Sequence, residues 1–152
     1  MTPRLLAAAR ATHEGSFHLA LAPDRAFELF TPEGERRWVP GWDPLMLGEL
    51  GPGTIFLTDH DGEQTIWTIL EADRGAGRLF YSRVSPGRRA GTVRVTLAPD
   101  GDGTSVTVAY DLTALGPDGE AAVASMAEMG FVAMLRRWEE MIGAALSLEK
   151  SE

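Results

Sequence analysis

Residues 117–148 read PDGEAAVASMAEMGFVAMLRRWEEMIGAALSL, which is typical of one long amphipathic helix. The run opens with a proline and an acidic residue, both suited to a first helical turn. Apolar side chains then recur every three or four residues and form one stripe, while arginines and glutamates occupy the opposite side. A helix over this run would be about 45 Å long. It therefore needs a long apolar surface on which to lie.

The region before this helix supplies such a surface as a series of short strands. Alternating apolar and polar residues indicate strands over residues 16–21, 45–50, 54–59, 64–72, 78–85, 91–98 and 104–114. The turns between the later strands are short and rich in Gly, Pro and Asp, so neighbouring strands are expected to be antiparallel. The sequence predicts an α+β fold in which an antiparallel sheet of about seven strands packs against the long helix.

Two short helices are expected between the first strand and the rest of the sheet. Pro23 and an acidic neighbour begin the first, over residues 24–30, in which two phenylalanines share one face. A second helix over residues 33–39 ends before Pro40, because a residue that precedes proline disfavours helical geometry.

Composition limits the classes of protein that the chain can belong to. Its 152 residues, 44% hydrophobic and 24% charged, predict a single domain over 1–152, with residues 1–13 as a possible flexible arm. The net charge of −8 argues against nucleic-acid binding. No apolar run reaches the roughly 20 residues of a membrane-spanning helix. The absence of cysteine suits a reducing compartment, and we expect a cytoplasmic location.

Residues 17–44 carry a resemblance to a known superfamily. They read FHLALAPDRAFELFTPEGERRWVPGWDP, which is similar to the opening strand and the P-x-x-x-F-x-x-F helix of START-like (SRPBCC) proteins. The predicted order of elements resembles that superfamily over nearly the whole chain. The resemblance implies a helix-grip fold, a curved sheet wrapped around the C-terminal helix with a cavity between them. Its members include lipid-transfer domains, polyketide cyclases and carriers of hydrophobic molecules.

Large and flexible side chains are the first candidates for the wall of that cavity. Trp138 lies on the apolar stripe of the long helix, while Trp38 and Trp42 lie where the resemblance places the cavity mouth. Thioethers adapt to apolar ligands of different shape, and the stripe carries several of them. The candidates on the helix are Met126, Gly130, Met134 and Trp138. Ordinary core packing explains the same residues, so both interpretations stay open here.

Few polar groups are expected inside. If the strands over 64–72 and 78–85 turn Thr68, Phe80 and Ser82 inward, then the threonine and the serine are interior polar groups. Tyr110 is the inward phenol and the best candidate to hydrogen-bond a carbonyl. Arg83 and Glu71 would qualify as interior acid–base groups only if this register were wrong by one residue.

No metal or cofactor is expected from the sequence. The three histidines, His13, His18 and His60, fall on different elements, whereas a metal site needs several converging ligands. Residues 100–104 resemble the start of a calcium loop, but a hairpin turn explains their glycines and aspartates. No nucleotide-binding or nucleophile motif is present in the sequence.

These observations favour a small hydrophobic molecule as the partner. The first hypothesis is binding of a lipid, polyketide or related metabolite in the cavity. The second is an enzyme of the polyketide cyclase/dehydrase type that uses the same cavity, which would need an interior acid or base. The third is a co-chaperone-like module that binds another protein.

Overall fold

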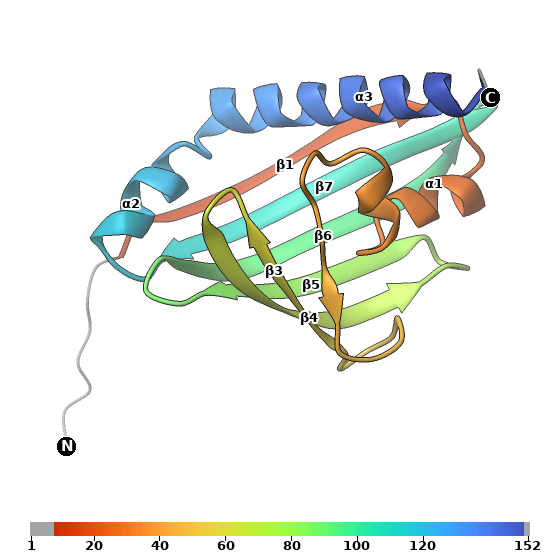
Figure 1. Cartoon of the computed structure of the whole chain (residues 1–152). Coiled ribbons are helices and arrows are strands. Elements are labelled where there is room, and N and C mark those ends of the chain that lie inside the picture. Colours follow the sequence, from red (N-terminus) through yellow and green to blue (C-terminus); the bar gives the residue numbers. More distant parts are fainter. Residues whose placement is uncertain (1–7, 151–152) are drawn as a thin grey trace.

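The structure, a computed structural model, describes residues 8–150 apart from the side chains of residues 128 and 150. It contains one seven-stranded antiparallel sheet in the order β1-β7-β6-β5-β4-β3-β2 (Figure 1). The strands are β1 (Arg10–Leu19), β2 (Leu45–Met46), β3 (Ile55–His60), β4 (Glu63–Asp73), β5 (Arg78–Ser85), β6 (Arg89–Asp100) and β7 (Gly103–Ala114). The helices are α1 (Pro23–Leu29), the 3-10 helix η1 (Gly34–Arg37), α2 (Pro117–Ala124) and α3 (Glu128–Lys150).

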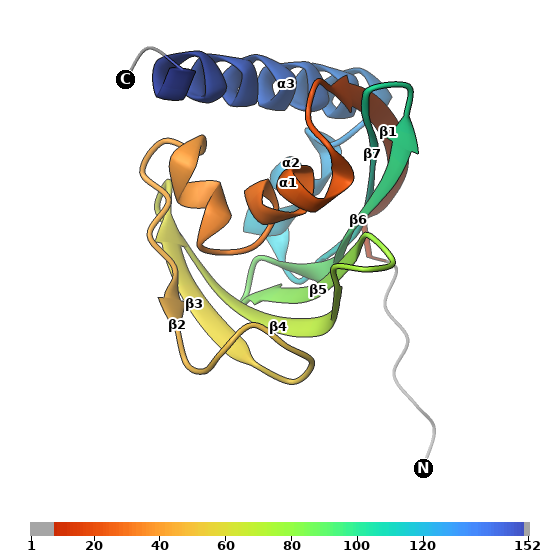
Figure 2. The ribbon, with the colours of Figure 1, turned by 90° about the vertical axis from the view of Figure 1, so that its right-hand side faces the viewer.

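The sheet curves, and α3 crosses the open side of the curve (Figure 2). α1 and η1 lie between the two, at one end of the space that the sheet surrounds. α3 packs along β1, and its Phe131, Leu135 and Ile142 belong to one apolar core with the buried side chains of β6 and β7. This arrangement confirms the predicted α+β fold with a curved sheet around a long C-terminal helix.

The first strand is longer than the sequence predicts. β1 begins at Arg10 and pairs with β7 along its whole length, from Arg10 opposite Thr113 to Leu19 opposite Thr104. The Arg10 guanidinium also lies 2.6 Å from the Asp111 carboxylate. Residues 10–13 therefore belong to the sheet rather than to an arm, and residues 1–7 lie outside the described part of the chain.

The predicted single helix over 117–148 is two helices with a turn between them. α2 ends at Ala124 and α3 begins at Glu128. At this break the chain comes so close to Gly130 that a Cβ atom there would lie 2.0 Å from the carbonyl oxygen of Ser125. Glycine fits at position 130 because it has no Cβ atom that would clash with the Ser125 carbonyl.

The side chains of β4 and β5 face the opposite way from the prediction. Trp67 and Ile69 of β4, with Tyr81 and Arg83 of β5, are buried on the inner face. The neighbours of these residues face outward, and Ile66 and Leu70 are 43% and 44% exposed. The predicted register is wrong by one residue because both faces of β4 carry large apolar side chains.

Candidate functional site

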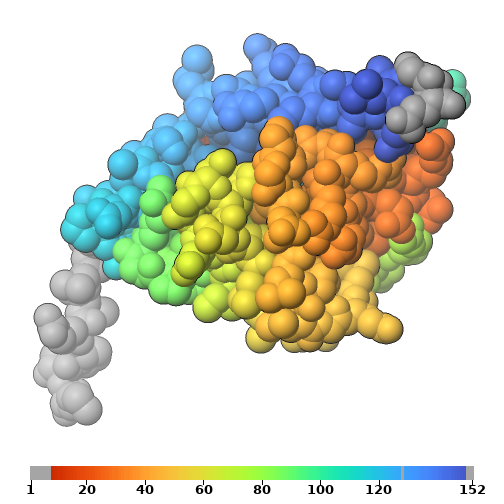
Figure 3. Space-filling view, viewed as in Figure 1, coloured from red at the N-terminus to blue at the C-terminus, as the bar shows by residue number. Residues whose placement is uncertain are grey.

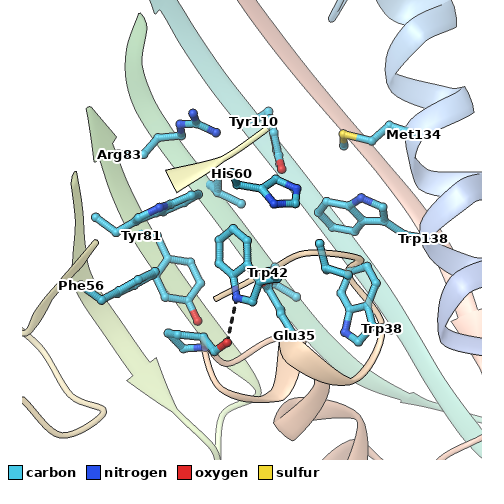
Figure 4. A pocket seen from close by; sticks show the side chains of 15 residues that line it. Glu35, Trp38, Trp42, Phe56, His60, Tyr81, Arg83, Tyr110, Met134 and Trp138 are labelled. Carbon is cyan, nitrogen blue, oxygen red and sulfur yellow. Dashed lines mark hydrogen bonds between the residues drawn. The ribbon is translucent and has the colours of Figure 1, made fainter. Parts of the chain in front are cut away.

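A cavity of about 190 Å³ lies between the inner face of the sheet, the segment around η1 and α3 (Figure 4). In the space-filling view, the segment that contains η1 (orange) lies against α3 (blue) and beside part of the β3–β4 hairpin (yellow) (Figure 3). Strands, η1 with its following loop, and α3 each contribute wall residues. These are Pro32, Glu35, Trp38, Val39, Trp42, Phe56, His60, Trp67, Tyr81, Arg83, Val93, Val95, Tyr110, Met134 and Trp138.

Aromatic rings in mutual contact form most of the wall. Phe56 and Trp67 stack with ring centroids 5.4 Å apart and planes 4° from parallel. Trp38 meets Trp138 edge to face at 5.4 Å, and Trp42 meets Trp67 in the same way at 6.0 Å. Such contacts stabilise the ring positions in addition to the burial of area. The cavity therefore has a rigid apolar wall.

Three of the four indole N–H groups hold these rings in place. Trp38 donates to the carbonyl oxygen of Leu29 at 2.7 Å, and Trp67 donates to the Thr58 hydroxyl at 2.9 Å. Trp42 donates to the carbonyl oxygen of Pro32 at 2.9 Å (Figure 4). Because these donors already have acceptors within the chain, the three tryptophans offer the cavity their ring surfaces.

Glu35 is an unusual group in this apolar wall. It enters the cavity from η1, and burial raises the pKa of its carboxyl group well above the ordinary value. No hydrogen bond or ion pair reaches this carboxylate from any residue that the structure describes. Desolvation without a compensating partner favours the neutral form of a carboxyl group. Glu35 therefore holds its proton to a higher pH than an exposed glutamate.

Two tyrosines near Glu35 differ in what their hydroxyls do. The Tyr81 hydroxyl donates to the carbonyl oxygen of Phe30 at 2.8 Å, and burial followed by the charge of Glu35 raises its pKa well above 10. Burial raises the pKa of Tyr110 to about 12, although Arg83 opposes this increase. Within the described residues no hydrogen bond uses the Tyr110 hydroxyl, so it is the phenol available to a ligand.

Arg83 reaches the cavity from β5 through a polar network. Its Nη2 atom lies 3.3 Å from Oε1 of Glu63 and 3.2 Å from the Ser85 hydroxyl, and the guanidinium lies 4.9 Å from the Trp67 ring centre. Burial, followed by the nearby charge of Arg89, lowers the pKa of Arg83, but the group stays charged. A fixed positive charge thus borders an otherwise apolar space.

Comparison with known proteins places the chain in a family. The family described as "Polyketide cyclase / dehydrase and lipid transport" matches residues 10–140, which include every wall residue of the cavity. The chain belongs to this family. The match confirms the resemblance to the SRPBCC superfamily drawn from residues 17–44. A comparison with curated proteins found no significant match.

Solved structures of similar shape support the helix-grip fold of this polyketide cyclase / dehydrase family protein. Ara h 8.0201 superposes with a TM-score of 0.66 at 15% identity, covering 91% of this chain and 99% of its own. Mll3558 from Rhizobium loti superposes with a TM-score of 0.66 at 20% identity, covering 92% of this chain and 99% of its own. Norcoclaurine synthase from Thalictrum flavum gives 0.62 at 14% identity, covering 93% and 95%. At these identities the likeness is one of fold.

The structure brings half of the predicted site residues together. The five that line the cavity are Trp38, Trp42, Tyr110, Met134 and Trp138. The apolar stripe predicts Met134 and Trp138, the strand alternation predicts Tyr110, and the family resemblance implies Trp38 and Trp42. That they contact a ligand stays a prediction.

The other five predicted residues lie elsewhere. Thr68, Phe80 and Ser82 are on the outer face of the sheet, where Thr68 pairs with Ser82 across β4 and β5. Met126 is buried in the turn before α3. Gly130 lies at the same break, close to the carbonyl oxygen of Ser125. The inverted strand register explains the outward position of the first three residues, and the helix break explains why the last two do not line the cavity.

Sequence reasoning missed the charged groups of the cavity. Glu35 stands among charged neighbours in the sequence, a pattern typical of a solvated surface, and His60 was weighed only as a metal ligand. The His60 side chain is only 26% exposed and packs edge to face on Trp42 at 5.6 Å. For Arg83 the sequence held one indication: a shift of one residue in the register of the strand over 78–85 turns its side chain to the inner face.

Neither a metal site nor a membrane span is found in the part of the chain that the structure describes. No three His, Asp or Glu side chains of that part come together in a way that could hold a metal ion. Among the described helices, none is long and apolar enough to cross a membrane.

Proposed function

We propose that this protein binds a compact, ring-containing hydrophobic molecule in the cavity between the sheet and α3. The observation that carries the proposal is a cavity of about 190 Å³ whose wall is mainly aromatic and whose indole donors are already satisfied. An apolar cavity of about 150 Å³ accommodates benzene. This one therefore suits one or two rings, whereas a lipid chain would require it to open. The family description includes lipid transport and so supports ligand binding.

Filling the cavity from α3 should abolish binding of such a molecule. Met134 lines the cavity, and Met134→Phe would place an additional aromatic ring in the space that the ligand needs. Titration calorimetry with the neutral probe 2-naphthamide should give about micromolar to 100 micromolar affinity for the unchanged protein. We expect Met134→Phe to weaken it at least tenfold.

The control is the same substitution on the same helix. Met129 is 84% exposed, so Met129→Phe should leave the affinity unchanged. Equal binding by both variants, or none by the unchanged protein, would contradict a ligand site between α3 and the sheet.

A second candidate function is an enzyme that transfers a proton within the same cavity. Glu35 supports it, since a carboxylic acid with a raised pKa, placed in an apolar cavity near a free phenol, is suited to donate a proton to a ligand oxygen. The cyclase/dehydrase hypothesis needs an interior acid or base, and Glu35 is a candidate for that group. The family description also includes cyclase and dehydrase activities.

The ionisation of Glu35 should change the free energy of unfolding, which can be measured as a function of pH. A carboxyl group whose pKa is higher in the folded than in the unfolded chain favours folding while protonated, so stability falls as pH rises through the folded pKa. Glu35→Gln removes this loss. In urea unfolding at pH 8, the variant should be more stable than the unchanged protein by more than the roughly 0.5 kcal/mol typical of surface substitutions. At pH 4.5 the two should agree.

The matched control for Glu35 is Glu33→Gln, one position before η1. The Glu33 side chain is 60% exposed and pairs with Arg36, so its replacement should change stability little at either pH. If Glu35→Gln also has no effect at pH 8, Glu35 ionises like an exposed carboxyl, and the enzyme candidate loses its proton donor.

A further inference from the structure

A second, polar cavity adjoins the first. It measures about 240 Å³ and lies on the side of the β3–β4 hairpin. Four residues line both cavities: Trp42, His60, Trp67 and Arg83. The aromatic cavity and this polar cavity therefore share part of their wall.

Arginines outnumber carboxylates in the polar cavity. Arg89 forms a bidentate pair with Glu63 at 2.9 and 2.7 Å. Arg83 and Arg88 each lie 3.3 Å from the same carboxylate. The other acidic residue of the wall, Asp61, is 89% exposed and lies 3.3 Å from the His60 ring.

This composition leaves an excess of positive charge. One buried carboxylate faces three guanidinium groups, on a chain whose net charge is −8. Arginine is suited to planar anions because its donors form a fixed fork. The polar cavity is thus a local cationic site within an acidic protein.

Arg83 has one donor that no residue in the described part of the chain satisfies. Its side chain is 8% exposed, and its Nε atom is buried without a hydrogen-bond partner. A buried donor left unpaired costs about 1–3 kcal/mol, so native proteins rarely keep one. Arg83 lines both cavities, so its guanidinium is a candidate partner for an acceptor atom of a bound molecule. This observation is independent of the charge count.

We propose that the polar cavity binds the carboxylate of a ligand whose ring occupies the aromatic cavity. The inference rests on the proposed function and narrows its ligand class to hydrophobic, ring-containing carboxylic acids. Arg83 joins the two halves of the site, since it lines both cavities and lies over the Trp67 ring. Arg88 is the peripheral member, and its side chain is 44% exposed.

The test compares 2-naphthoate with 2-naphthamide, which have the same ring and differ in the charge of one group. Titration calorimetry of the unchanged protein should show about tenfold tighter binding of the carboxylate, as expected of a charge-assisted hydrogen bond. Arg88→Ala should reduce that preference to less than threefold.

The control variant is Arg78→Ala. Arg78 lies on β5, is 49% exposed and pairs with one glutamate, Glu71, at 3.1 Å, yet it lines neither cavity. It should keep the full preference for 2-naphthoate. If Arg78→Ala reduces the preference as much as Arg88→Ala, the effect is a long-range one of net charge, and the site is overturned.

The remaining outcomes separate this inference from the function on which it rests. Equal affinities for the two probes overturn the carboxylate site and leave the aromatic cavity as a binding site. Failure of both probes to bind overturns the proposed function itself. Arg83→Lys keeps the charge but removes the Nε donor, and it should lower naphthoate affinity several-fold. If that variant does not fold, Arg88→Ala decides the question.

Discussion

Trp38→Ala should lower the free energy of unfolding by about 4 kcal/mol, because large-to-small replacement of a buried aromatic typically costs 3–5 kcal/mol. The Trp38 side chain is 5% exposed and lies between Phe30, with ring centroids 5.8 Å apart, and Trp138 at 5.4 Å. It also donates to the carbonyl oxygen of Leu29. Its removal would leave a void between α1, η1 and α3. Urea unfolding followed by far-ultraviolet circular dichroism measures the loss.

Trp38→Phe separates the two contributions of this side chain. Phenylalanine keeps most of the buried area but leaves the Leu29 carbonyl without its donor, which should cost about 1–2 kcal/mol. A loss below about 1 kcal/mol for Trp38→Ala would show that α3 does not pack on Trp38. Trp38 and α3 would then not form a joint wall of the aromatic cavity.

The parts of the fold that the sequence predicts well are those with a single apolar face. In β6 and β7 the inner side chains, such as Val95 and Val108, alternate with polar neighbours, and both are buried as expected. On α3 the stripe that carries Met134 and Trp138 faces the sheet, as its spacing indicates. Where burial is one-sided, periodicity alone identifies the inner face.

The parts that it predicts badly are those where both faces are apolar or where a charge lies inside. Ile66 and Leu70 alternate with Trp67 and Ile69 along β4, so hydrophobicity does not distinguish the faces. Arg83 is buried beside Glu63, which the hairpin that begins β4 brings to it. That pairing depends on strand register, which sequence reasoning had inverted.

Glu35 is a charged interior residue on a helix, and the sequence likewise does not identify its position. It has charged neighbours on both sides in the sequence, and η1 is only four residues long. A helix this short has no periodicity by which an inner position could be recognised. The inward position of Glu35 follows from the packing of η1 beneath α3, which is a tertiary property.

Glu63→Gln should lower the free energy of unfolding at pH 7 by about 2–3 kcal/mol, since it leaves three arginines around a neutral amide. Burial opposes the ionisation of Glu63, but the hydrogen bond from Arg89 and the charges of Arg83 and Arg89 outweigh burial and lower its pKa to about 2. The Glu63 side chain is 13% exposed, so solvent screens these interactions only weakly.

The pH dependence follows from the sign of that shift. A carboxyl group whose pKa is lower in the folded chain stabilises the fold above its unfolded value of about 4.5, and the stabilisation is lost as pH falls toward 2. Urea unfolding between pH 7 and 2.5 should therefore show the unchanged protein converging on Glu63→Gln at the acid end. Glu71→Gln is the control, because Glu71 is 40% exposed and pairs with one arginine, so its effect should stay below about 1 kcal/mol. Equal losses for the two variants at pH 7 would mean that the arginines around Glu63 are solvated, and the polar cavity would then lack the dry, cationic character that carboxylate binding requires.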